Sequence, residues 1–154
     1  MGEREYDQFE SPEDAIYRAI VSALRNDTDL NRINWYYFDY DNDEDNAEEI
    51  PSEGKIPAIR VMVSNQTRDL YSTDREEAIL ALDIESWIPS NHVGDAWGIR
   101  HSIFKALMLF RVTSVFSAPR VMGIIPGEIE QISRGLMRSV QTAQISYFVE
   151  NPRR

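Results

Sequence analysis

Cysteine is absent from the 154 residues, so the chain has no disulfide, no thiolate metal site and no cysteine nucleophile. Histidine is scarce, with only His92 and His101. No apolar run approaches the roughly 20 residues that span a bilayer, and the N-terminal MGEREYDQFE has no hydrophobic signal core. We therefore expect a soluble, unexported chain with no membrane partner.

The motifs of common enzymes are missing as well. There is no Walker loop and no G-x-G-x-x-G, because the glycines are scattered singly. His92 and Asp95 can be drawn as a His–Asp pair, but no serine stands in a nucleophile-elbow context. His101 follows Arg100 in a predicted helix, a position typical of a surface or an interface. The sequence predicts no enzyme, no catalytic residue and no cofactor.

The two ends of the chain differ in charge. Residues 1–54 contain 16 acids and 4 bases, a net charge of −12. Residues 55–95 contain 7 acids and 4 bases, a net charge of −3. Residues 96–154 contain 3 acids and 8 bases, a net charge of +5, and the three sum to −10. The overall acidity argues against a protein that binds nucleic acid by neutralising phosphates. Two interpretations stay open. One is compositional drift, since folding can mix both halves on one surface, and the other is a head-to-tail oligomer in which an acidic face meets a basic face.

Two helices are predicted, over residues 11–26 and 95–110. In the first, Ser11 is the N-cap and Pro12 the first helical residue, and acids follow in the first turn. The second is expected to be the buried core helix of the domain. This expectation rests on one apolar face of the helix, formed by Ala96, Ile99, Ile103, Leu107 and Phe110. Three further residues are expected to widen that face: Trp97, Phe104 and Met108.

The remaining apolar segments have strand character. They lie at residues 33–38, 55–63, 78–88, 112–116, 121–125 and 136–149. A turn or hairpin is predicted over residues 64–74, and a second turn at Pro126-Gly127, with Glu128 and Glu130 exposed beside it. The order predicts an α+β fold, with a mostly antiparallel sheet of four to six strands packed with two main helices. We expect residues 1–154 to form a single domain.

The only compositionally biased segment is FDYDNDEDNAEE, residues 38–49, which overlaps an acidic loop insert predicted over residues 39–54. Its acids are Asp39, Asp41, Asp43, Glu44, Asp45, Glu48 and Glu49. An EF-hand loop needs a bidentate Glu at position 12, but counting from Asp39 puts Ile50 there and counting from Asp41 puts Ser52 there. We therefore predict no specific metal site. A mobile loop and a surface that functions by being negative both stay open.

The layout resembles the tail terminator proteins of long-tailed bacteriophages, which cap a completed tail tube. The resemblance covers about residues 11–150 as a pattern of elements. It rests on the amphipathic helix Pro12 to Leu24, the strands IPAIRVMV and ALDIESWI, a helix that opens DAWGIRHSIFKAL, and the alternating strand RSVQTAQISYFVE. The long acidic insert has no counterpart in a family motif.

The resemblance implies a structural virion protein without catalytic residues, located at the head-proximal end of the tail and assembled in the host cytoplasm. Its expected partners are copies of itself in a ring of six, the tail tube protein, a head-side connector or neck protein and, in a contractile tail, the sheath protein. DNA would pass through without specific binding. The alternatives are another phage neck or head-tail connector protein, or a non-viral, acidic cation-binding module.

Two expectations follow for the ring. The acidic segment would face the channel or a partner, because an acidic lining repels DNA over about 10 Å at moderate salt. The subunit interface would include four basic residues, namely Arg100, His101, Arg153 and Arg154.

Overall fold

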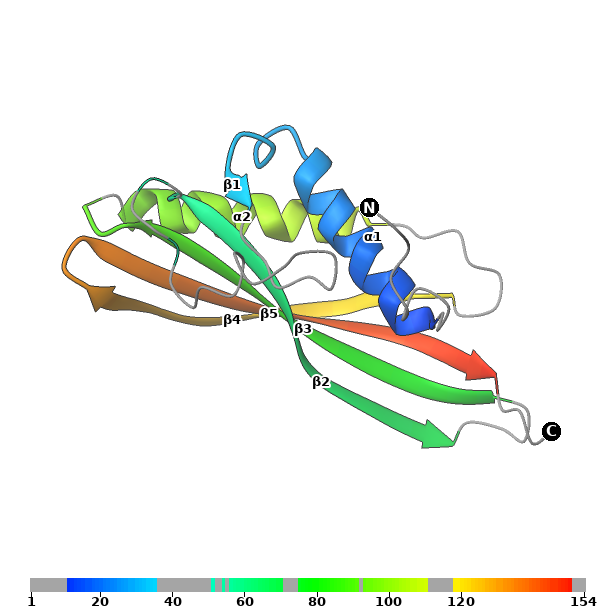
Figure 1. Ribbon diagram of the computed structural model, residues 1–154. Helices are drawn as coiled ribbons and strands as arrows, with labels where there is room; N and C mark the ends of the chain where they lie inside the picture. The colour runs from blue at the N-terminus through cyan, green and yellow to red at the C-terminus, as the bar shows by residue number, and fades with distance from the viewer. Residues whose placement is uncertain are drawn as a thin grey trace, which may run out of the picture.

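The computed structural model describes residues 11–35, 51, 54, 56–70, 75–91, 93–110 and 118–150. Two helices and five strands make up this part of the chain (Figure 1). In chain order they are α1 (Pro12–Asn26), β1 (Asn34–Trp35), β2 (Ala58–Leu70), β3 (Arg75–Pro89), α2 (Val93–Met108), β4 (Arg120–Ser133) and β5 (Leu136–Glu150).

Helix α1 begins as its sequence predicts. The Oγ of Ser11 accepts a hydrogen bond from the backbone N–H of Asp14 at 3.0 Å, and Pro12 occupies the first turn, where no intrahelical N–H bond is lost. Four apolar residues at helical spacing face inward and are buried: Ile16, Ile20, Val21 and Leu24. The predicted helix over residues 11–26 is thus confirmed to within one residue.

The strands form one sheet in the order β1-β2-β3-β5-β4. The short β1 pairs with β2 in parallel, and every other pair is antiparallel. Together with two main helices, this confirms the predicted α+β fold with a mostly antiparallel sheet. The final strand, predicted over residues 136–149, is also confirmed, because β5 pairs with β3 along its whole length.

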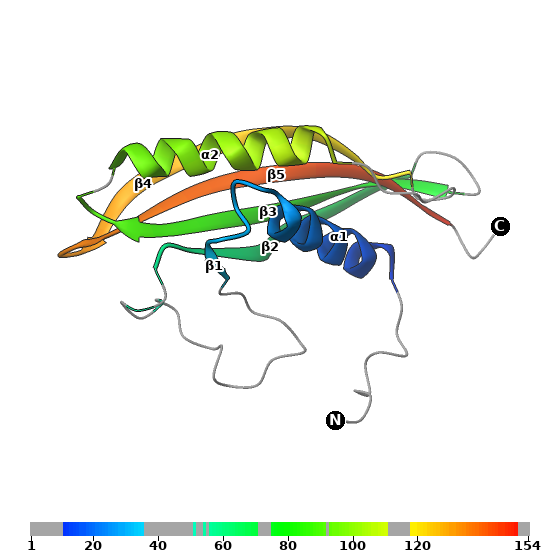
Figure 2. The same cartoon turned by 90° about the horizontal axis from the view of Figure 1, so that it is seen from above.

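Both helices lie on the same face of the sheet, with α2 on the side of β4 (Figures 1 and 2). The main core fills the space between the two layers. On β3 it takes alternate residues from Ala78 to Ile84, and on β5 it takes Ala143, Ile145 and Tyr147. The other residues of these strands point to the opposite face, which no described helix covers. We call this the open face.

Strand β2 is longer than predicted. Of the turn or hairpin predicted over residues 64–74, the hairpin is confirmed, because β2 and β3 are consecutive antiparallel strands, whereas a turn over residues 64–70 is wrong, because β2 continues to Leu70. A register shift between Val63 and Asn65 accommodates one extra residue. The polar run from Ser64 to Thr67 is therefore an exposed stretch of strand. It resembles a turn in its composition but not in its backbone.

The turn predicted at Pro126-Gly127 is also wrong. Strand β4 passes through both residues and has a register shift between Pro126 and Ile129. An edge strand tolerates proline at a bulge, where the missing N–H interrupts no ladder. The chain turns instead at Arg134-Gly135, where Gly135 adopts φ 87°, a conformation that a residue without Cβ reaches at no steric cost.

Helix α2 begins and ends two residues before the predicted bounds of 95–110, and its burial differs from the prediction. Ala96, Ile103 and Leu107 are buried against the core, whereas Trp97, Phe104 and Met108 are exposed. The expectation that these three widen the buried face is wrong. The helix lies on the outside of a single sheet, so only the side toward the strands is covered.

Several predictions fall outside the described residues. They are the strand over 112–116, the end of the strand over 33–38, and the seven acids of the segment Asp39–Glu49. The single-domain expectation for residues 1–154 stays a prediction.

Candidate functional site

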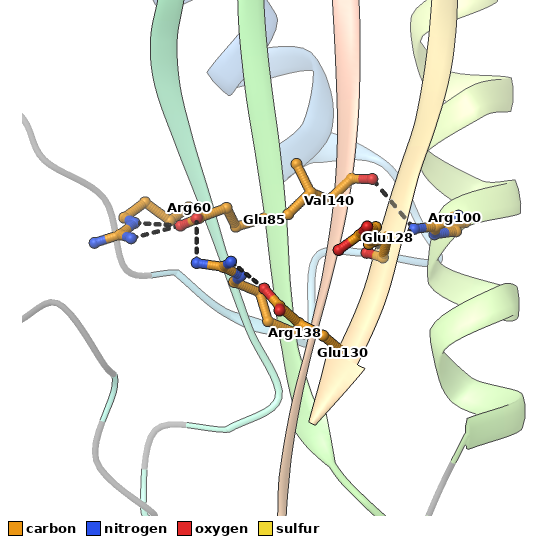
Figure 3. Close-up of polar contacts among 7 residues, drawn as sticks. All are labelled: Arg60, Glu85, Arg100, Glu128, Glu130, Arg138 and Val140. Atoms are coloured by element: carbon orange, nitrogen blue, oxygen red, sulfur yellow. Dashed lines mark hydrogen bonds and ion pairs between the residues drawn. The ribbon is translucent and has the colours of Figure 1, made fainter. Parts of the chain in front are cut away.

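A chain of ion pairs crosses four strands on the open face. Arg60 of β2 donates from Nε to Oε1 of Glu85 on β3 at 2.7 Å. Arg138 of β5 approaches the other oxygen of Glu85 at 3.5 Å and pairs with Glu130 of β4 (Figure 3). The register explains the order, because Arg60 lies opposite Glu85 and Glu130 opposite Arg138. We call these four residues the ion-pair network.

The network lies over a buried tryptophan. The guanidinium carbons of Arg60 and Arg138 lie 5.9 and 5.7 Å from the centre of the Trp87 ring, within cation–π distance. The indole Nε1 of Trp87 is buried and makes no hydrogen bond to any described residue. Packing and the two cations therefore hold the ring. A small apolar cluster continues beneath it: Ala58 and Leu136, with Ile56 and Ile132 partly buried against them.

The chemistry of the network is that of a structural connection. Its two positive and two negative charges balance, and each carboxylate accepts from a guanidinium. Glu85 and Arg60 are each only 6% exposed at the side chain, and buried charges of this kind persist only when paired. The network therefore joins β2, β3, β5 and β4. Both of its carboxylates are paired with guanidiniums, so neither is free to act as an acid or base.

Arg100 makes a second polar connection, on the helix side. Its Nη2 donates to the carbonyl oxygens of Glu128 and Val140, each at 3.2 Å (Figure 3). The same Nη2 donates to the carbonyl oxygen of Gly127 at 2.5 Å, and Nε donates to Ser139 Oγ at 2.5 Å. Gly127 and Glu128 lie in the β4 bulge, where the pairing register shifts, and Val140 lies on the facing part of β5. Burial lowers the pKa of Arg100 from its ordinary value, because the guanidinium is partly dehydrated. The residue fastens α2 to β4 and β5.

A flank of α2, beside Arg100, carries an exposed apolar stripe. Trp97 is 65% exposed, Phe104 45% and Met108 43%, and exposed His101 lies among them. The intervals of four, three and four residues put all four side chains on one face of the helix. We call these four residues the α2 outer face.

The two described residues of the predicted interface point in different directions. Arg100 reaches into its own chain, whereas His101 is exposed on the α2 outer face. Arg153 and Arg154 lie outside the described residues, as do all the acids of the segment Asp39–Glu49. The structure therefore leaves the predicted interface and the predicted role of the acidic loop as predictions.

The sequence also singled out His92, Asp95, Glu128 and Glu130. His92 lies outside the described residues, and Asp95 is exposed in the first turn of α2. Glu128 and Glu130 are residues of β4, so their expected place in a turn is wrong, and Glu130 is committed to Arg138. In the part of the chain that the structure describes, no group of three or more His, Asp or Glu residues could hold a metal ion.

Sequence reasoning missed the ion-pair network. The signal was present in part, since Glu85 follows Ile84 in a strand where apolar residues alternate with acids. Its burial depends on Arg60 and Arg138, which lie 25 and 53 residues away. No local pattern predicts such a contact, and none predicts that Arg100 turns toward a bulge.

Among the described residues, no helix is long and apolar enough to cross a membrane. Neither the known protein families nor the curated proteins include one that matches this chain.

Proposed function

We propose that this chain is a structural protein that assembles with copies of itself into a ring and caps the tail tube of a long-tailed phage. The observation that carries the proposal is the exposure of large apolar side chains on a fold whose ion-pair network joins its own strands. Trp97, Phe104 and Leu109 are exposed on or beside α2, and Met122 and Ile125 on β4.

Exposed apolar side chains of this size favour an assembly function. Isolated ones are ordinary, but a cluster on one element of a monomer marks an interaction surface. The exposed residues of α2 lie on the helix layer, whereas Ile125 lies opposite Thr142 on the open face. A subunit in a ring meets two neighbours through two different surfaces, and exposed apolar side chains on both faces of the fold are compatible with this arrangement.

The charge distribution also supports a ring. The net −12 of residues 1–54 and the net +5 of residues 96–154 provide complementary charge for contacts between successive copies. A channel that passes DNA should repel it, and the segment Asp39–Glu49 would do so if it lined the channel or its rim. Finding this segment on the outer circumference of an assembled ring would overturn that part of the proposal.

Two other functions compete with this one. Another phage neck or head-tail connector protein would also form a ring, but at a different level of the particle. An acidic cation-binding module outside any virus would function as a monomer and respond selectively to calcium. The second reading draws only on the seven acids of the segment Asp39–Glu49.

Electron microscopy of native particles with an antibody or gold label against this chain tests the proposal. The expected label lies at the head-proximal end of the tail tube. A second arm incubates the protein with purified tubes and measures the lengths of the tubes. These lengths should stop increasing when the protein is present. Label at another level of the neck would favour a connector, and label absent from particles would overturn the proposal.

A further inference from the structure

One edge of the molecule exposes apolar side chains on both of its layers. On the helix layer these are the side chains of the α2 outer face, of which Trp97 is 65% exposed. On the sheet layer, Met122 and Ile125 of β4 are each 50% exposed. Helix α2 lies on the side of β4 (Figures 1 and 2), and among the described strands β4 pairs only with β5. We call this surface the α2–β4 edge.

The spacing of the α2 outer face indicates which kind of element fits it. Its four residues follow one another at intervals of four, three and four, which is the spacing of the seam between two packed helices. Helix α1 has no such seam, because its exposed residues are Ala15, Arg18, Ser22 and Asn26. In the described part of the chain, the helix with a matching seam is therefore α2 of another copy.

Two α2 helices packed antiparallel about a two-fold axis are self-complementary. Trp97 of one copy then lies against Met108 of the other, because the two residues are equally far from the centre of the stripe. His101 lies against Phe104 in the same way. Strand β4 runs back along α2 on the flank where Arg100 reaches the sheet (Figures 1 and 2). The same axis therefore places the two β4 strands edge to edge and antiparallel, with the helices of both copies on one face of the two sheets.

The charges of β4 favour the same arrangement. Arg120 begins the strand, Glu128 lies further along it, and both are exposed. Neither forms an ion pair within the described part of the chain. An antiparallel contact brings Arg120 of each copy toward Glu128 of the other, so opposite charges meet twice. Lys105, which adjoins the stripe, is balanced by Asp29 of its own chain.

The size of the contact requires both layers of the edge. Large aromatic side chains present roughly 150–250 Å², so the exposed fractions of Trp97 and Phe104, 65% and 45%, amount to about 200 Å² per copy. A stable interface removes about 800 Å² from each partner, so the stripe alone is too small and the side chains of β4 have to contribute. The three register shifts of β4 limit a continuous ladder between the strands. Side-chain packing therefore dominates the contact.

We propose that the α2–β4 edge binds the same edge of a second copy of this chain about a two-fold axis. An isologous contact closes at two copies, so the inference goes beyond the proposed ring and assigns a dimer to the free chain. Arg100 and Gln141 hold α2 on the sheet before contact, which lowers the entropy lost on binding. The dimer covers the apolar side chains of this edge, so a ring that uses them forms only after the dimer separates.

Sedimentation velocity over a concentration series measures the dissociation constant of the dimer. Trp97→Ser should raise it by roughly 30-fold or more, the effect of an interface hot spot, because a two-fold contact contains this side chain twice. Phe104→Ser should raise it in the same direction. The matched control is Val63→Ser, which removes a 55% exposed apolar side chain from β2, on the other side of the sheet, and should leave the constant within about threefold. Circular dichroism melts verify that the variants fold.

A charge exchange tests the pairing of the two β4 strands. Arg120→Glu and Glu128→Arg should each raise the dissociation constant by roughly fivefold, because each variant brings like charges together at two places. The double variant restores opposite charges and should return the constant to within about threefold of the wild type. A double variant that associates no better than either single variant would overturn the two-fold arrangement.

Cysteine pairs test the direction of the helices. The chain has no cysteine, Gly98 and Lys105 are exposed beside the stripe, and a Cβ added at Gly98 meets nothing within 4 Å. An antiparallel contact puts Gly98 of one copy near Lys105 of the other. A mixture of Gly98→Cys and Lys105→Cys chains should therefore form a disulfide-linked dimer under mild oxidation, whereas either variant alone should not. Linked dimers of each variant alone, with none between the two, would overturn the antiparallel contact.

The remaining outcomes separate this inference from the proposed function. Unchanged self-association of folded Trp97→Ser and Phe104→Ser would overturn the inference, and so would a wild-type chain that stays monomeric at its highest soluble concentration. Tube capping seen by electron microscopy would still support the function in either case. Absence of the chain from particles, with the dimer intact in solution, would overturn the function alone.

Discussion

The buried Glu85 connects residues of three strands. Its carboxylate lies between Arg60 and Arg138, and both guanidiniums also lie over Trp87. Removing one partner of a buried pair leaves charge without its counter-charge in a site that excludes water, and this costs more than the pair itself contributes.

We therefore predict that Glu85→Ala lowers the free energy of unfolding by about 3–5 kcal/mol, measured by urea denaturation. Glu85→Gln should lower it less, because the amide oxygen still accepts one hydrogen bond. The control is Lys105→Ala, which removes a half-exposed 3.5 Å contact with Asp29 and should change stability by at most about 0.5 kcal/mol. Equal effects of Glu85→Ala and Lys105→Ala would contradict the buried network.

Two glycines of β4 provide a matched pair. A Cβ at Gly127 would lie 2.8 Å from the carbonyl oxygen of Val140, whereas one at Gly123 meets nothing within 4 Å. We predict that Gly127→Ala destabilises the fold by about 1–3 kcal/mol through overpacking. Gly123→Ala should be neutral or slightly stabilising. Thermal melts of both variants decide the matter, and equal melting temperatures would show that the bulge relaxes without cost.

At the scale of elements, helix α2 has two sides with different functions. One side packs on the core, and Arg100 reinforces it by donating to carbonyls of Gly127 at the β4 bulge and of Val140 on β5. The other side is apolar and exposed. The helix therefore connects the stability of the fold to the proposed contact between copies.

Arg100→Lys tests the first of these functions. Lysine keeps the charge but lacks the planar fork that reaches several carbonyls at once, so we expect a loss of about 1.5–3 kcal/mol in unfolding free energy. Hydrogen exchange should quicken at the β4–β5 amides around Gly127. Arg18→Lys, at an exposed ion pair within α1, is the control. Changed self-association with unchanged stability would instead assign Arg100 to the interface.

The whole molecule is strongly acidic, and calcium separates two explanations for that charge. A monomeric cation-binding module would be stabilised by about 2.7 kcal/mol when calcium is at 100 times its dissociation constant. Since neither register of the acidic segment supplies the ligand that closes an EF-hand loop, we predict equal shifts of melting temperature with calcium and with magnesium at equal concentration. A large shift with calcium alone would favour the cation-binding module.

Some features of the whole molecule could be predicted from the sequence because they arise locally. Helix α1 was predicted to within one residue, since its cap, its proline and its apolar stripe all lie within 15 residues. Strand β5 was predicted from alternation, and the order of elements predicted the α+β class. These signals come from hydrogen bonding and periodicity, which act between residues near in sequence.

Tertiary structure alone decided the rest. Pro126-Gly127 resembles a turn, but at the edge of a sheet it becomes a bulge in a continuous strand. Trp97 and Ile103 are both apolar residues of one helix, and the position of the sheet decides which of them is covered. Glu85 is buried because residues distant in the chain bring it two guanidiniums. Composition predicts how many apolar and charged side chains a chain carries. Packing between distant segments determines which of those side chains remain in contact with water.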